Sequence, residues 1–160
     1  MNIFYLDRDI DYAVRYHCDS HAVKMSLETA QIRCTALHRI GEPAPYKSTH
    51  AKHPSVLWCG DGLAHYQWLI RFGRALCAEY TYRYGRHHAS EAVIDTLPDT
   101  PPLPDTGWTD PPQAMPDEFK RPDPVDGYRA FYVGEKAHFA KWMERPVPFF
   151  MALQTLGVAE

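Results

Sequence analysis

The sequence contains no apolar run that approaches the length of about 18 residues needed to cross a bilayer. The first residues, MNIFYLDRDID, also lack the basic and then apolar layout of a signal peptide, because acidic residues follow almost at once. Both absences argue against a membrane-spanning or secreted protein. We therefore expect a protein of the cytoplasm that does not associate with membranes.

Paired cysteines are missing as well. The four cysteines lie far apart, form no CxxC pair and fall mostly in stretches with a helical pattern; they are Cys18, Cys34, Cys59 and Cys77. Neither a disulfide framework nor a cysteine-based zinc motif has this spacing. We interpret them as reduced thiols of the core, which agrees with a cytoplasmic protein.

A surplus of positive charge is absent too. The chain has 17 Lys and Arg against 20 Asp and Glu, for a formal net charge of −3. Nucleic-acid-binding domains usually carry a strongly basic surface. Eight of the nine histidines lie in residues 1–96, so this part becomes cationic as they protonate. Any contact with DNA must therefore come from a local patch.

The patterns that are present predict a mostly α fold. With 160 residues and 45% hydrophobic content, residues 1–160 are most simply one domain. Asn2 to Leu6 form a short extended arm or strand, and one or two helical turns then reach Tyr16. Asp19 or Ser20, and later Asp126, are expected to cap helices. The expected fold is a bundle of four or five helices, drawn from residues 19–40, 54–59, 61–84, 88–97 and 126–143.

Proline dominates one segment. Nine prolines fall between Pro98 and Pro124. We expect residues 98–125 to form a long extended loop within the domain, because the remainder of the chain is too short to fold alone. Within this loop Gln113–Phe119 is the part expected to be tied down.

A row of chemically active side chains follows one side of the predicted helix 19–40. His21, Lys24, Glu28 and Gln31 recur at steps of three, four and three, so they stack along the helix. A histidine, an amine, a carboxylate and an amide in one row have the groups needed for acid–base or nucleophilic chemistry. They are equally compatible with an ion-paired surface strip.

The row also belongs to a wider pattern. Asp19-x-His21 followed by Glu28 resembles the Asp-x-His…Glu helix of the pyrimidine-dimer DNA glycosylases of the endonuclease V type. Further segments are similar to bacterial relatives of that family, namely Lys24…Glu28…Gln31, His53-Pro54…Trp58 and Gly73…Cys77…Glu79…Arg83…Gly85. Arg129…Lys136 is an echo of the family's C-terminal helix. The motifs HCDxHxVKMxxETAQ and EYTxRYG are closer still to short phage proteins without a characterised activity, which adds host cytoplasm as a location.

The resemblance implies amine chemistry without a cofactor. In that family the N-terminal amine attacks C1′ of a damaged nucleotide, a Schiff base forms, the base leaves and β-elimination can cut the strand. A helix glutamate stabilises the sugar cation and moves protons, and it corresponds to Glu28. Asn2 is bulky enough for Met1 to be retained, so the amine is that of Met1. α-Amino groups titrate at about 7.7–8.0 and lysines at about 10.4, which favours Met1 over the alternative nucleophile, Lys24.

The sequence offers further candidate site residues. His21 joins Glu28, Met1 and Lys24 as a catalytic candidate. The substrate, DNA or a nucleotide, would be bound by cationic and imidazole side chains, which are Lys47, His50, His53, Arg71, Arg74 and Arg83. The arginines that flank the glutamate in the phage member correspond here to Leu27 and Gln31, so the lesion recognised can differ.

A second class of function remains open. Two pairs of histidines at short spacing could hold a metal ion, one pair from a helix and one from a loop. They are His17, His21, His50 and His53. The alternative to an enzyme is therefore a phage-type binding or inhibitor protein whose His-rich helix is stiffened by metal. Trapping with borohydride separates the two classes, because only an imine-forming enzyme yields a covalent adduct with abasic DNA.

Overall fold

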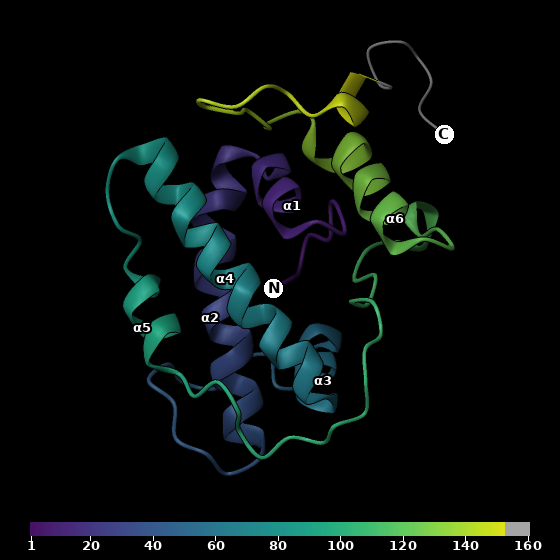
Figure 1. Cartoon of the computed structure of the whole chain (residues 1–160). Coiled ribbons are helices and arrows are strands. Elements are labelled where there is room, and N and C mark those ends of the chain that lie inside the picture. The colour runs from purple at the N-terminus through teal and green to yellow at the C-terminus, as the bar shows by residue number, and fades with distance from the viewer. Residues whose placement is uncertain (153–160) are drawn as a thin grey trace.

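The computed structural model describes residues 1–152, and these form a mostly helical fold, as predicted (Figure 1). Among the described residues there is no β-strand. The α-helices are α1 (Ile10–Tyr16), α2 (Asp19–Arg39), α3 (Pro54–Asp61), α4 (Leu63–Tyr84), α5 (Ser90–Thr96) and α6 (Pro124–Phe131). Within these residues, none of the helices combines the length and the apolar character that a membrane crossing requires.

Several helix ends follow from local signals. The carboxylate of Asp9 accepts the first free N–H groups of α1, and Pro54 occupies the first turn of α3 as predicted. Gly85 ends α4 with a φ of +69°, a conformation that glycine adopts without a Cβ clash. The predicted cap of α2 was wrong. Cys18 precedes the helix without a side-chain cap, and Asp19 lies in its first turn.

Helices α2 and α4 form the centre of the molecule. They pack against each other, α3 and α5 each contact both of them, and α1 packs on α4 (Figure 1). One large core cluster draws residues from the N-terminal arm, from α1 to α4, from the proline-rich segment and from α6 onward. Its fully buried members include Leu6, Ile32, Leu69, Phe72 and Tyr132. This shared core fixes the arm relative to the central helices.

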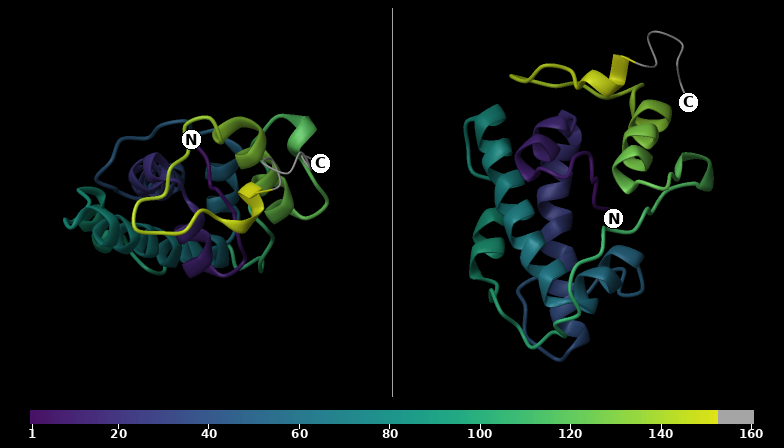
Figure 2. Two further views of the ribbon diagram at one scale, coloured as in Figure 1. Left: turned by 90° about the horizontal axis from the view of Figure 1, so that it is seen from above. Right: turned by 45° about the vertical axis from the view of Figure 1, so that its right-hand side comes forward.

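The N-terminal arm, residues 1–9, is the element that positions the site. It has no regular secondary structure, yet Ile3, Phe4, Tyr5 and Leu6 are each at most 3% exposed. Both side views place the N-terminus at mid-height, between the central helices and α6 (Figures 1 and 2). The first residues are thus an interior part of the fold.

The last predicted helix, residues 126–143, was wrong at both ends. Asp123, not Asp126, caps α6, because Pro124 already occupies its first turn. The α-helix ends at Phe131 and continues as one π-helical turn, Tyr132–Lys136. At Gly134 any side chain would collide with the ring of Phe119. A continuous helix over 126–143 would turn Phe139 inward, seven residues after Tyr132, but Phe139 lies beyond this turn and is 40% exposed.

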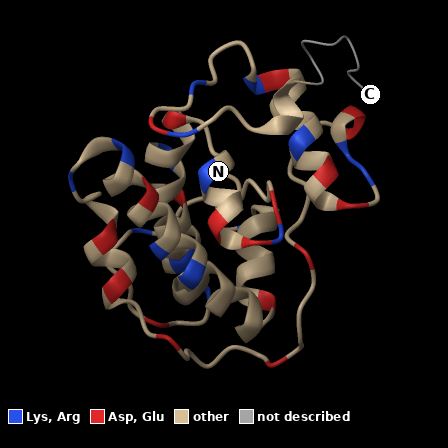
Figure 3. Cartoon of the chain, turned by 45° about the horizontal axis from the view of Figure 1, so that its top comes forward, with Lys and Arg blue, Asp and Glu red and all other residues tan. Residues whose placement is uncertain are grey.

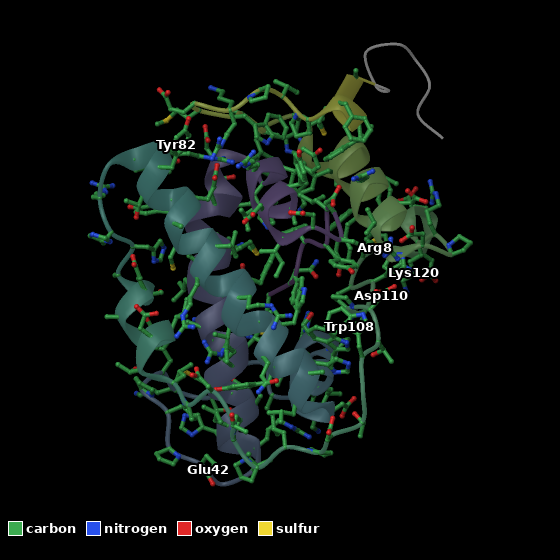
Figure 4. The ribbon with its side chains drawn as sticks, viewed as in Figure 1. Arg8, Glu42, Tyr82, Trp108, Asp110 and Lys120 are labelled. Atoms are coloured by element: carbon green, nitrogen blue, oxygen red, sulfur yellow. The ribbon has the colours of Figure 1, made fainter. Side chains whose placement is uncertain are left out.

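The proline-rich segment is extended, as predicted, and passes along one side of the helices. The carboxamide of Gln113 holds both the N–H and the carbonyl of Arg121, which ties down the expected part of the loop. Arg8 of the arm pairs with Asp110 of this segment, and Figure 4 shows both on the right-hand side of the molecule. The segment therefore faces the arm over part of its length.

Candidate functional site

The α-amino group of Met1 lies 2.8 Å from Oε1 of Glu28 in the middle of α2. Glu28 is buried, with 5% of its surface exposed. The methionine side chain is 1% exposed and packs against the core, whereas the residue as a whole is partly exposed. The accessible surface of Met1 is therefore on its main chain, where the amine is. The structure brings together the two groups that the resemblance had paired.

The second oxygen of Glu28 has no partner. Oε2 is buried and makes no hydrogen bond within the described part of the chain. A buried oxygen without a hydrogen bond typically costs about 1–3 kcal/mol. Glu28 thus holds the amine with one oxygen and keeps the other available to accept a proton or a hydrogen bond from a ligand.

The register between the arm and α2 explains how the amine reaches Glu28. The ring of Phe4 stacks on that of His21, with centroids 4.4 Å apart and an interplanar angle of 13°. Three extended residues span roughly 10 Å, and the seven helical residues from His21 to Glu28 also span roughly 10 Å. The arm therefore runs antiparallel to α2, so that seating Phe4 on His21 delivers Met1 to Glu28.

His21 is held in a neutral pair with Tyr132. Its Nδ1 lies 2.6 Å from the tyrosine hydroxyl. Burial, together with the charges of His17, Lys136 and Lys24, lowers the pKa of His21 to about 3. Burial raises the pKa of Tyr132 well above its usual value. His21 is therefore uncharged at neutral pH, and its contacts with Phe4 and Tyr132 make it a support of the arm.

Lys24 lies on the same row of α2 and is exposed. It has no ion-pair partner among the described residues. A lysine becomes a nucleophile at neutral pH when it is desolvated, and this one is solvated. The amine that the structure places against Glu28 is that of Met1.

The loop between α2 and α3 contributes His53. Its Nδ1 accepts the N–H of Ser55 and so caps α3, which leaves the proton of the neutral ring on Nε2. Partial burial, the positive N-terminus and His50 lower the pKa of His53, while Glu28 opposes them. His53 thus stands within electrostatic reach of both Met1 and Glu28. The other predicted ligands in this loop, His50 and Lys47, are exposed.

Two of the predicted arginines are engaged elsewhere. Arg74 pairs with Asp95 of α5, and Arg71 is exposed one turn earlier on α4. Arg83 is fully buried and donates to the carboxylates of Glu79 and Asp19 and to the main-chain carbonyls of residues 14, 15 and 17. Its hydrogen-bonding capacity is used within the protein, so Arg83 joins α4 to α1 and α2.

The structure does not gather the four histidines of the alternative metal site. Nδ1 of His17 lies 2.7 Å from the carbonyl of Ala13, and burial lowers the pKa of His17 to about 4. His21 pairs with Tyr132, as described above. Over residues 1–152 no group of three or more His, Cys, Asp or Glu side chains is arranged to hold a metal ion.

The sequence did not predict the contacts that the arm makes with the proline-rich segment and with α6. Asn2 hydrogen-bonds to the carbonyl of Ala114 and lies beside the hydroxyl of Tyr128. Helical periodicity places Tyr128 and Tyr132 inward, and both are buried. No signal in the sequence pairs them with the arm, because more than a hundred residues separate the partners.

The arrangement of charged residues does not single out the site. In the view of Figure 3, Lys and Arg are interspersed with Asp and Glu over the helices and loops. Comparison of the chain with protein-family models, with curated proteins and with solved structures finds no match. The site is therefore defined by its own geometry: the Met1 amine on Glu28, with His53 and Lys24 nearby.

Proposed function

We propose that this protein is a DNA glycosylase with AP-lyase activity. In this proposal the amine of Met1 attacks C1′ of a damaged or modified nucleotide, and Glu28 acts as general acid and base. The observation that carries the proposal is the 2.8 Å contact between a chain-terminal amine and a buried carboxylate. Most chain termini are poorly ordered, so an amine held in this way has a specific task or a specific structural role.

The chemistry assigns each atom of this pair a role. Oε1 of Glu28 takes a proton from the ammonium group, which frees the nitrogen lone pair. The nitrogen then bonds to C1′, and the glycosidic C1′–N bond breaks with its electron pair leaving on the base, which is protonated as it departs. The new secondary ammonium gives up one proton, which is passed to the ring oxygen as the C1′–O4′ bond opens, and a protonated imine results. Loss of a proton from C2′ then expels the 3′ phosphate by β-elimination. The unpartnered Oε2 of Glu28 is available to accept a proton in these steps.

The surroundings of the pair fit a phosphodiester substrate better than an uncharged one. Lys24 on α2 is exposed, as are Lys47 and Lys52 in the loop that leads to His53. Because the formal net charge is −3, these local cations would supply a weak and salt-sensitive affinity for DNA. We propose that the protein acts in DNA repair in the cytoplasm, that of a host cell if the chain is of phage origin. The four buried free thiols support a reducing compartment.

The test is reductive trapping. The purified protein, whose intact mass must place Met1 at its start, is mixed with an oligonucleotide containing one abasic site, and sodium borohydride is added. The expected result is a covalent adduct whose tryptic peptide carries the sugar on the Met1 nitrogen. Protein whose α-amine has been acetylated should give none. If the unmodified protein also gives none with abasic or base-damaged DNA, the proposal is rejected.

A further inference from the structure

The side chain of Asn2 ties the arm to two distant parts of the chain. Its Nδ2 donates to the carbonyl of Ala114 at 2.9 Å, and its Oδ1 accepts the N–H of Ile3 at 2.8 Å. The hydroxyl of Tyr128 lies 3.0 Å from Oδ1 and 2.5 Å from the carbonyl of Pro112, so its single proton is shared between them. The second residue of the chain is thus fastened to the proline-rich segment and to α6.

The residue before it is fastened in a different way. The side chain of Met1 is 1% exposed and packs against the main hydrophobic cluster. The α-carbon that bears the amine therefore lies between two fixed points, the buried thioether side chain and the hydrogen-bonded Asn2. With both ends held, the amine remains beside Glu28 without searching for it, and its ordering is provided by folding.

We propose that the Met1 side chain and the Asn2 carboxamide together form a positioning device, an apolar anchor and a polar tether, that holds the α-amine on Glu28. The role of this device in catalysis rests on the proposed function, whereas its effect on the position of the amine does not. Neither group touches the reacting atoms; both act through the placement of the nitrogen. The initiator methionine is thereby a specific requirement of the site, because a shorter first side chain would leave the anchor position empty.

The test compares two variants of the same arm. Asn2→Leu keeps a side chain of similar volume, which should also preserve Met1, but it removes every hydrogen bond of the tether. Arg8→Ala is the matched control, because it breaks the exposed pairs with Asp110 and Asp123 and leaves Asn2 untouched. Intact mass verifies that Met1 is present in each protein, and circular dichroism verifies the helical fold.

The first readout is the reactivity of the amine itself. Each protein is treated with a limiting amount of acetic anhydride, and peptide mass spectrometry compares acetylation at Met1 with that at the exposed Lys24. We expect the ratio to rise at least tenfold in Asn2→Leu and to stay within twofold of the wild type in Arg8→Ala. If Asn2→Leu does not fold, Asn2→Gln replaces it, since it keeps a neutral amide but moves it by one methylene away from its place at Ala114, and a rise of at least threefold is expected.

The second readout separates the two proposals. The rate of borohydride trapping at saturating abasic DNA should fall at least tenfold in Asn2→Leu, while the DNA concentration for half-maximal rate stays within threefold. An unchanged acetylation ratio overturns the positioning device, whatever the activity. A raised ratio in a protein whose wild type traps no DNA supports the positioning device and removes the glycosylase proposal.

Discussion

The hydroxyl of Tyr132 lies 2.6 Å from Nδ1 of His21, and both rings are buried against Phe4. The same hydroxyl accepts the N–H of Cys18, just before α2 begins. The pair thus joins the start of α2, the arm and the π-helical turn after α6 by a contact between two neutral groups. Its stability is insensitive to pH near neutrality and sensitive in acid.

Acid should therefore destabilise the fold through its buried histidines. Burial lowers the pKa of His17 to about 4 and, with nearby cations, that of His21 to about 3, from an ordinary value of 6.5. The unfolded chain takes up these protons first, so stability is complete above pH 6.5 and is lost as the pH falls toward the folded values. Each histidine contributes up to about 1.4 kcal/mol per pH unit in this window. Urea unfolding of wild type and His21→Asn between pH 7.5 and 4.5 measures the slopes. A variant with an undiminished slope would contradict the assignment.

Replacement of Glu28 should separate activity from folding. Glu28→Gln retains the shape of the side chain but loses the proton-accepting charge, so trapping and strand cleavage should fall at least about 100-fold. The helical circular dichroism should be unchanged. Glu118→Gln, which neutralises an exposed carboxylate, is the control. Full activity in Glu28→Gln would remove Glu28 from the mechanism.

Moving the α-amine away from position 1 should abolish borohydride trapping of abasic DNA, even though Lys24 is unchanged. Extending the terminus by two residues moves the amine away from Glu28, so no imine should form, although the thermal unfolding curve should show a folded protein. Lys24→Arg should be tolerated, because an exposed cation is retained. The opposite pair of results would assign the nucleophile to Lys24.

Among the ion pairs of α4, the buried group of Arg83, Glu79 and Arg145 should contribute more to the unfolding free energy than the exposed pair of Arg74. Although burial alone would raise the pKa of Glu79, hydrogen bonds from Arg145 and Arg83 hold it below its usual range. Arg83→Met leaves buried carboxylate and carbonyl groups unpaired and should cost about 3–5 kcal/mol of unfolding free energy. Arg74→Met on the same helix breaks only an exposed pair and should cost less than about 1 kcal/mol. Urea titrations of both variants measure the difference.

Binding to DNA should weaken with salt in proportion to the cations beside the site. Removing Lys24, Lys47 or Lys52 one at a time should lower the slope of log affinity against log salt by about 0.9 for each phosphate that is no longer neutralised. Fluorescence anisotropy with a labelled abasic duplex measures the slope. Arg74→Met should leave it unchanged, and tight binding that ignores salt would point to another class of ligand.

The sequence predicted the fold where local signals act alone. Pro54 and Gly85 set helix ends by their own backbone chemistry, and the structure agrees. Asp126 was a plausible cap, but Asp123 lies directly before a proline and starts α6 three residues earlier. In the π-helical turn after that helix, Phe119 packs at Gly134, a contact that periodicity does not reveal.

The candidate site shows the same division. The row on α2 follows from helical spacing, and the pairing of Met1 with Glu28 is an expectation from the resemblance. Arg83 was predicted as one of the cations that bind the substrate. Its partners in the structure are instead Glu79 one turn earlier, Asp19 and the carbonyls at the end of α1, and most of these are distant in the sequence.

The hydrogen bonds of Asn2 can form only late in the synthesis of the chain. Its partners lie at residues 114 and 128, so ribosomes must add more than a hundred residues after Asn2 before its side chain can make these two contacts. At typical synthesis rates this takes on the order of ten seconds. During that interval the polar tether cannot form. Asn2, among the first residues to be synthesised, is thus among the last to reach its native hydrogen bonds.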